Sequence, residues 1–93
     1  MILSFQSKET EAIWRGETVR RLPPEIQQTA RRKLRMLNNA RSLLDLRIPP
    51  ANRLEALRRD RKGQHAIRIN DQWRICFVWT HAGPANVEIV DYH

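Results

Sequence analysis

The sequence lacks several features that mark common protein classes. It has a single cysteine, Cys76, so no disulfide can form within the chain, and we expect a reducing, cytoplasmic environment. The longest unbroken apolar run covers residues 75–79, whereas a helix that spans a membrane needs about 20 residues. The first residues show no basic region ahead of an apolar stretch, which excludes an ordinary signal peptide.

Motifs for common enzyme chemistries are also missing. The sequence contains no phosphate-binding loop, dinucleotide fingerprint, nucleophile elbow or metalloprotease helix. The three histidines, His65, His81 and His93, are 16 and 12 residues apart. Structural zinc sites need four clustered ligands, so we expect neither a metal nor a cofactor.

Positive charge is what the sequence has in excess. Seventeen Lys and Arg residues against ten Asp and Glu residues give a net charge of +7, and 14 of the 17 are arginine. A surplus of this size on a small chain favours a polyanionic partner, with nucleic acid first. Arginine strengthens this reading, because a guanidinium grips phosphate through two parallel hydrogen bonds and stacks on bases. The alternative is that the arginines only solvate helix faces.

Residues 1–93 are enough for a single domain, and their patterning divides at the second of two proline pairs, Pro23-Pro24 and Pro49-Pro50. Before it, we expect a short strand over residues 1–5 and helices over residues 7–16 and 24–43. In the second helix the apolar residues follow steps of four, four and three, which place them on one face: Ile26, Ala30, Leu34 and Leu37.

After residue 50 the hydrophobic period changes from about 3.6 to 2. We expect strands over residues 53–58, 65–70, 73–80 and 86–92, with reversals at 59–64, at 70–72 and at Gly83-Pro84. Short connections indicate an antiparallel meander. The prediction is an α+β domain in which two N-terminal helices cover one face of a twisted antiparallel sheet and leave the other face open.

The alternation also predicts which side chains point toward the helices. On residues 73–80 one face carries Trp73, Ile75, Phe77 and Trp79, and the other carries Arg74, Cys76 and Val78. We interpret Trp73 and Trp79 as core aromatics, with Trp14 packing a helix on the same core. Cys76 is expected to be a small buried residue and not a nucleophile.

A basic stretch lies between residues 53 and 74, with seven basic and three acidic groups. On a meander the strands that bear them lie about 5 Å apart, so we expect one patch that holds a phosphodiester backbone. Pairing across strands, for example of Glu55 with Arg68 or Arg74, is the alternative, although basic groups outnumber their partners. The basic residues are Arg53, Arg58, Arg59, Arg61, Lys62, Arg68 and Arg74.

The sequence closes on Asp91-Tyr92-His93, directly after the alternating residues 87–90. Histidine gives and takes protons near neutral pH, a carboxylate can act as a base, and tyrosine can stack on a base or donate a proton. Beside a guanidinium patch, this set suits attack by an RNA 2′-hydroxyl on the neighbouring phosphate without a metal. A frayed terminus is the alternative.

The chain resembles a known family at several of these positions. The residues concerned are 53–57 (RLEAL), 60–63 (DRKG), 67–70 (IRIN), 72–75 (QWRI) and the closing 91–93 (DYH). Together with the opening strand they resemble the HigB toxins, with the GraT-like branch nearest, in the RelE/ParE toxin superfamily of type II toxin–antitoxin systems. The resemblance covers essentially the whole chain.

The resemblance implies a RelE-like microbial RNase fold and a small cytoplasmic toxin that cleaves mRNA in the ribosomal A site. It also implies two partners, the ribosome with its mRNA and a HigA-like antitoxin that has a helix-turn-helix domain. Contact with operator DNA would be made only through this antitoxin. By matching position, it makes His93, Asp91 and Tyr92 the C-terminal catalytic group, and Arg74 and Arg58 basic residues of the site.

Two positions depart from the family pattern. Several HigB proteins carry a catalytic histidine where this chain has Glu55, and an amide before the tryptophan is asparagine in some relatives and Gln72 here. Glu55 could serve as the base instead, because surrounding arginines favour its ionised form. Arg53, Arg59, Arg61, Lys62 and Arg68 are then expected to contact ribosomal RNA and mRNA.

Three functions remain open from the sequence. The first is a ribosome-dependent mRNA endonuclease, with Asp91 or His93 as base and His93 or Tyr92 as acid. The second is a non-nucleolytic toxin of the ParE branch that inhibits DNA gyrase, for which the Asp-Tyr-His end would have no chemical use. The third is a passive RNA-binding module, which would bind with a strong salt dependence and yield no product.

Overall fold

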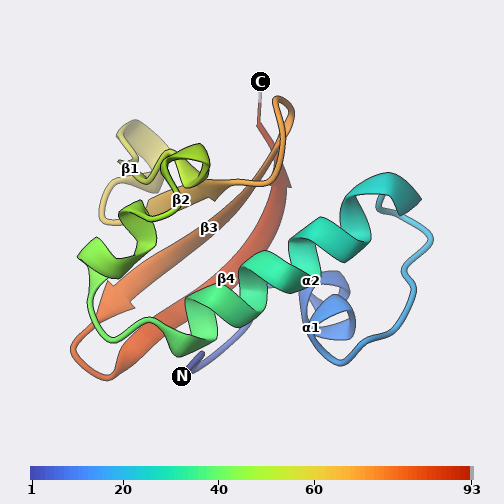
Figure 1. The fold of residues 1–93 in the computed structure, drawn as a ribbon, viewed down its shortest axis with the longest axis horizontal. Helices are drawn as coiled ribbons and strands as arrows, with labels where there is room; N and C mark the ends of the chain where they lie inside the picture. The colour runs from blue at the N-terminus through green and yellow to red at the C-terminus, as the bar shows by residue number, and fades with distance from the viewer. Residues whose placement is uncertain (93) are drawn as a thin grey trace.

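The computed structural model describes residues 1–92, and the expectations placed on His93 lie outside them. Four strands form one antiparallel sheet in the order β1-β2-β3-β4, as the alternating pattern predicts. They are β1 (Glu55–Ala56), β2 (His65–Arg68), β3 (Trp73–Thr80) and β4 (Gly83–Asp91). Two N-terminal helices complete an α+β fold, with the longer helix running across one face of the sheet (Figure 1).

The two helices are α1 (Lys8–Trp14) and α2 (Pro24–Asn39). The Ser7 side chain caps α1 by accepting a hydrogen bond from the backbone N–H of Thr10 at 3.2 Å. Pro24 stands in the first turn of α2, where its missing N–H costs nothing. The predicted apolar face of α2 is buried over its whole length, which confirms the periodicity.

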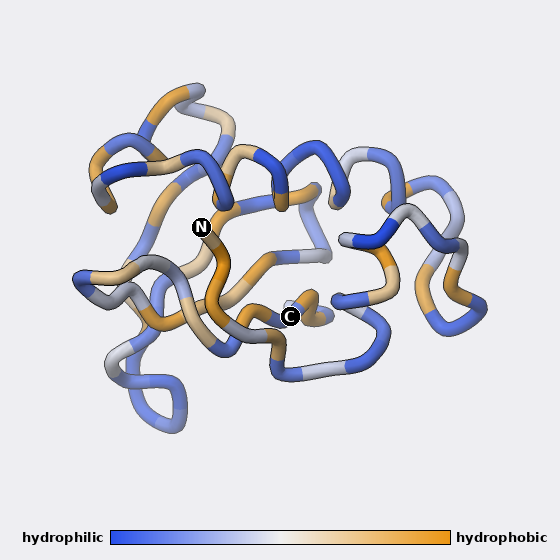
Figure 2. Tube along the Cα trace, turned by 90° about the horizontal axis from the view of Figure 1, so that it is seen from below, coloured by the Kyte–Doolittle hydropathy of each residue, from blue (hydrophilic) through white to orange (hydrophobic). Residues whose placement is uncertain are grey.

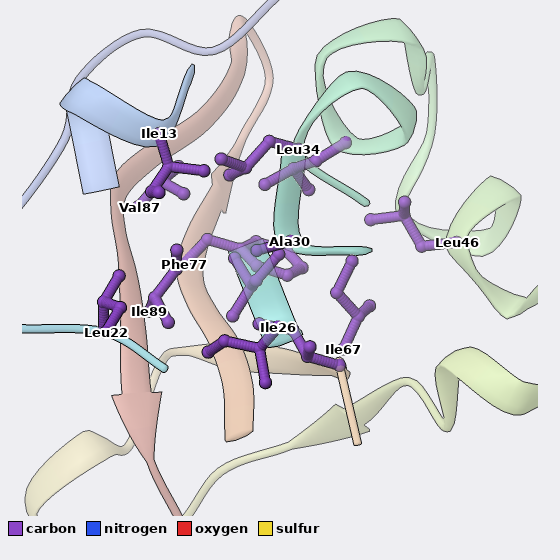
Figure 3. Packing of buried hydrophobic residues seen from close by; sticks show 13 residues of the cluster. Ile13, Leu22, Ile26, Ala30, Leu34, Leu46, Ile67, Phe77, Val87 and Ile89 are labelled. Atoms are coloured by element: carbon purple, nitrogen blue, oxygen red, sulfur yellow. The ribbon is translucent and has the colours of Figure 1, made fainter. Parts of the chain in front are cut away.

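The main core lies between α2 and the sheet. In Figure 3, Ile26, Ala30 and Leu34 of α2 lie near Phe77 of β3 and Ile67 of β2. The predicted core aromatics Trp14, Trp73 and Trp79 are partly buried against this cluster. The peripheral loops are mostly hydrophilic (Figure 2). The buried members are Ile13, Leu22, Ile26, Ala30, Leu34, Leu37, Leu46, Ile67, Ile69, Ile75, Phe77, Val87 and Ile89.

The opening residues lie beside β4 without forming a regular strand. Phe5 makes an isolated parallel bridge with Val87, and Leu3 N–H donates to the Pro84 carbonyl at 2.8 Å. A Cβ on Gly83 would lie 2.3 Å from the Met1 carbonyl oxygen, so only glycine fits there. The strand expected over residues 1–5 is therefore wrong in its length, although its place beside the sheet is real.

The segment between α2 and β1 departs most from expectation. The helix expected over residues 24–43 ends at Asn39, and two short 3₁₀ helices follow, η1 (Leu43–Arg47) and η2 (Pro50–Asn52). Asn52 is fully buried and ties this segment to α2, since it accepts from Lys33 Nζ and donates to the Leu46 carbonyl at 3.1 Å. Burial, joined by the charges of nearby arginines, lowers the pKa of the Lys33 amine.

Two further expectations need correction. The strand expected over residues 53–58 is only the two-residue β1, because Arg53 turns into a left-handed conformation with φ of 46° and a third 3₁₀ helix, η3 (Arg59–Arg61), follows. Gly83-Pro84 is no reversal but the start of β4. The turn lies just before it, where the Thr80 hydroxyl accepts from the N–H groups of Ala82 and Gly83.

No helix among residues 1–92 has the length and apolar character that crossing a membrane requires.

Candidate active site

The face of the sheet turned away from α2, here called the open face, carries a row of directly paired residues. Glu55 of β1 pairs with Ala66 of β2, Ala66 with Cys76 of β3, and Cys76 with Glu88 of β4. Directly opposite residues share a face, so two carboxylates stand at the ends of a small apolar floor. The floor is a second buried cluster of Leu57, Ala66 and Cys76, with Val90 packed against it.

Burial raises the pKa of the Cys76 thiol to about 11, so the thiol is protonated at neutral pH. A buried, protonated thiol is a poor nucleophile, in line with the reading of Cys76 as a packing residue. Among residues 1–92, no group of three His, Cys, Asp or Glu residues is placed to hold a metal ion.

A hollow of about 700 Å³, here called the cleft, lies at one end of the open face. It brings Tyr92, from the end of the chain, next to residues from the segment around β1. Its lining residues are Glu55, Ala56, Leu57, Arg58, Arg59 and Tyr92. Three residues predicted as catalytic, Glu55, Arg58 and Tyr92, therefore share one hollow with a predicted RNA-binding residue, Arg59.

Arg74 joins this group through Tyr92. Its guanidinium carbon lies 5.1 Å from the centre of the Tyr92 ring, a cation–π arrangement. Arg74 Nη1 also donates hydrogen bonds to the backbone carbonyls of Asn70 and Trp73, which help to orient the guanidinium. The Nε atom of Arg74 is buried and has no hydrogen-bond partner within residues 1–92. Two carbonyls thus anchor Nη1 of Arg74, and the Nε donor is unsatisfied among the described residues.

Arg68 adds to the positive charge of the open face. It lies directly opposite Arg74 in the β2–β3 pairing, although like charges opposite each other destabilise a sheet. Arg68 forms an ion pair with Asp71 in the β2–β3 turn, and in residues 1–92 no carboxylate lies within 4.0 Å of Arg74. The predicted pairing of Glu55 with Arg68 or Arg74 does not occur among these residues.

Gln72 contacts both Asp91 and Tyr92 and helps to hold them in register. The Gln72 carbonyl accepts from the Tyr92 N–H at 2.6 Å, and Gln72 Nε2 donates to Asp91 Oδ2 at 3.1 Å. Sequence reasoning noted Gln72 only as a departure from the family pattern and missed this role. The available signal was its place just before β3, where the partner strand brings the end of the chain.

The remaining predicted RNA-binding residues do not gather in the cleft. Arg53 and Lys62 are exposed in turns, and Arg61 forms an ion pair with Glu88 at 3.5 Å farther along the open face. Of the seven basic residues between positions 53 and 74, Arg58 and Arg59 line the cleft, and a single phosphate-binding patch stays a prediction. Arg59 adopts a left-handed φ of 57°, an unusual conformation for a side-chain-bearing residue, at the edge of the cleft.

Comparison with known proteins places the chain in a family. Residues 3–93 match the family described as RelE-like toxin of type II toxin-antitoxin system HigB. Toxin HigB-1 of Vibrio cholerae is 41% identical over 80 residues, which are 85% of this chain and 84% of that protein. An uncharacterized protein of Haemophilus influenzae is 36% identical over 62 residues, 67% of this chain and 61% of that protein.

The family match spans nearly the whole chain, and the α+β fold agrees with it. A toxin of this kind acts as one half of a pair, so an antitoxin is its partner. The chain belongs to the HigB family of RelE-like toxins of type II toxin–antitoxin systems.

Proposed function

We propose that this toxin is a ribosome-dependent mRNA endonuclease that cuts without a metal by using the RNA 2′-hydroxyl. The observation that carries the proposal is the cleft, where the carboxylate of Glu55, the guanidinium of Arg58 and the ring of Tyr92 converge, with Arg74 over the ring. Acid–base cleavage of RNA needs a base, an acid and cations for the phosphate oxygens, and this set contains all three.

In the reaction, the 2′-oxygen attacks the adjacent phosphorus, a bond forms between them, and the bond from phosphorus to the 5′-oxygen breaks. The base takes the 2′-hydroxyl proton and the acid protonates the departing 5′-oxygen, which leaves a cyclic phosphate and a 5′-hydroxyl. Glu55 is the base best placed in the cleft, and the Tyr92 hydroxyl is the acid. Arg74 and Arg58 bind the equatorial phosphate oxygens, where negative charge develops.

Asp91 is less directly placed for this chemistry. It lies opposite Trp73 in the β3–β4 pairing, and strand alternation sends its side chain to the face opposite that of Tyr92. We therefore assign Asp91 to holding the end of the chain through Gln72. His93 remains a candidate acid or base from the sequence alone.

The family resemblance supports the ribosome as the place of cleavage and the cytoplasm as the location of the protein. It also supports a HigA-like helix-turn-helix antitoxin as the partner, with operator DNA contacted only through that antitoxin. The cleft supports dependence on a larger partner too. Its β1 wall is a strand of only two residues, so the protein alone offers little surface to hold an mRNA. On this proposal the ribosome supplies the positioning that such a wall cannot.

Primer extension on mRNA incubated with the purified toxin, with and without ribosomes, tests the proposal. We expect cuts only in the presence of ribosomes. The same assay on a chain that lacks His93 measures what the terminal imidazole contributes, with circular dichroism as the folding control.

Absence of cuts under both conditions would refute the endonuclease. Inhibition of gyrase supercoiling would then support the ParE-like alternative, and salt-dependent RNA binding without product would support the passive module.

A further inference from the structure

A second hollow, of about 450 Å³, lies on the same open face as the cleft. Glu88 lines this second hollow, and Glu55 lines the cleft. The two residues are the opposite ends of the row of paired residues that crosses the open face. The residues that line the second hollow are Gln6, Asp60, Arg61, Gln64, Asn86 and Glu88. None of them belongs to the catalytic group proposed above.

The two hollows are close enough for one nucleic-acid strand to reach both. From Glu55 to Glu88 the row crosses three strand spacings, about 14 Å. The short helix η3 separates them, with Arg59 at its start in the cleft and Arg61 at its end in the second hollow. An RNA strand whose phosphate is held in the cleft can therefore place a neighbouring nucleotide in the second hollow.

The chemistry of the second hollow differs from that of the cleft. Its only cation among the lining residues, Arg61, forms an ion pair with Glu88 and donates to Gln64 Oε1 at 3.1 Å. With Asp60 also present, the formal charge of the lining is about −1, which disfavours phosphate. Three amide side chains and two carboxylates are instead the groups that read the edges of bases.

Four of the six lining residues, Arg61, Gln64, Asn86 and Glu88, already make hydrogen bonds within the protein. Arg61 bridges Gln64 and Glu88 across the hollow, as just described. On the β4 side, Asn86 N–H donates to Ser4 Oγ at 2.8 Å, and Ser4 Oγ donates to Asn86 Oδ1 at 3.3 Å. The amide NH₂ of Asn86 and the second oxygen of Glu88 have no other partner within residues 1–92. A partly ordered wall with unused donors and acceptors lowers the entropic cost of binding.

We propose that the second hollow binds one unpaired base of the mRNA, next to the phosphodiester held in the cleft, and selects bases that carry an exocyclic amino group. Carboxylates accept hydrogen bonds from amino groups, and Asn or Gln pairs with amide-like base edges. Adenine, cytosine and guanine have such a group, whereas uracil does not. This inference rests on the proposed endonuclease function and adds a source of sequence preference to it.

The test maps cut sites on a library of mRNAs bound to ribosomes, with the wild-type toxin and a Glu88→Gln variant. We expect wild-type cut sites to be depleted in uracil at one position at a fixed offset from the cut. Glu88→Gln keeps the shape but removes a charged acceptor, so this depletion should weaken at least about fivefold, the lower end of what one specific base contact provides. Unchanged base frequencies in the variant would overturn the proposal.

Glu25→Gln is the matched control, because it makes the same charge change in the first turn of α2, outside both hollows on the open face. It should reproduce the wild-type base frequencies. Gln6→Ala is a second variant, which leaves the pair of Arg61 and Glu88 intact, and it should shift the same position as Glu88→Gln. Thermal unfolding of each variant checks folding, so Gln6→Ala keeps the test valid if Glu88→Gln fails to fold.

The wild-type result separates the two proposals. Absence of cleavage with ribosomes present refutes the endonuclease function itself. Cleavage with no base preference near the cut leaves the endonuclease function standing and refutes the base-binding role of the second hollow.

Discussion

The two faces of the sheet carry different kinds of buried side chains. The helix-covered face packs large aliphatic and aromatic side chains into a cluster of thirteen buried residues, whereas the buried floor of the open face has three, Leu57, Ala66 and Cys76. Because burial of apolar side chains supplies most of the stability, that stability comes mainly from the helix-covered face. The open face can therefore carry opposed arginines and a charged cleft at little cost to the fold.

Neighbouring residues of β3 offer the strongest test of this contrast. Phe77 points into the helix-covered core and Cys76 into the floor of the open face, and both are fully buried. We expect Phe77→Ala to lower the free energy of unfolding by about 3–5 kcal/mol, because it leaves a large cavity. Cys76→Ala removes one sulfur and should cost about 1 kcal/mol. Urea unfolding followed by circular dichroism measures both.

Equal losses for the two variants would show that the open face contributes as much to stability as the helix-covered face. The two residues are adjacent on β3, although Phe77 lies at an irregularity in the β3–β4 pairing and Cys76 is paired with Glu88.

Replacement of Arg74 should break function and spare the fold. We expect Arg74→Ala to slow single-turnover cleavage on ribosomes at least tenfold, and toward 10²–10³-fold, the usual loss for one transition-state donor of about 2.7–4 kcal/mol. Arg74→Lys keeps the charge but lacks the planar fork and should recover only part of the rate.

Arg21→Ala is the control for the general loss of one positive charge, because the Arg21 side chain is 84% exposed and lies outside the cleft. It should cleave at close to the wild-type rate. A wild-type rate for Arg74→Ala would remove Arg74 from the site.

The smallest expected effect concerns the pH dependence of stability. It comes from the buried amine of Lys33, on the side of α2 that packs against η2. Its pKa is lowered in the folded protein, so between that value and the ordinary 10.5 the unfolded chain holds more protons, and folding becomes more favourable as pH rises. Lys33→Met removes this dependence. The stability of the variant relative to wild type should therefore be greatest near neutral pH and fall as pH approaches 10.5.

Urea unfolding at a series of pH values measures the difference. Lys62→Met, at an exposed position, is the control for the replacement of a lysine by methionine. A difference that stays constant with pH would mean that the burial of the Lys33 amine does not affect folding.

Periodicity was sufficient to predict most of the fold. The apolar steps of α2 and the alternation in β2 and β3 are direct consequences of helix and strand geometry, so they can be read from residue order. The segment between Ala40 and Arg53 could not be predicted in this way. Its conformation depends on a tertiary contact, the burial of Asn52 against α2 and η1, which no local pattern reveals.

The candidate site was predictable by residue type more than by arrangement. Arginine content and the closing Asp-Tyr-His led to the chemistry that we propose, but only the register of β3 and β4 brings Tyr92 to Arg74 and links Gln72 to Asp91. The same register separates Arg61 from the cleft by pairing it with Glu88. Distances between chain segments far apart in sequence decide these contacts, and residue spacing does not contain them.

The meeting of Glu55 and Tyr92 in one hollow has a consequence for biosynthesis. The two residues are 37 positions apart, an interval of about 2–7 s at usual translation speeds. A nascent chain has no complete cleft until the last residues of β4 have been made, have left the ribosome and have paired with β3. On the proposed function, the surface that binds mRNA is therefore among the last parts of the protein to form.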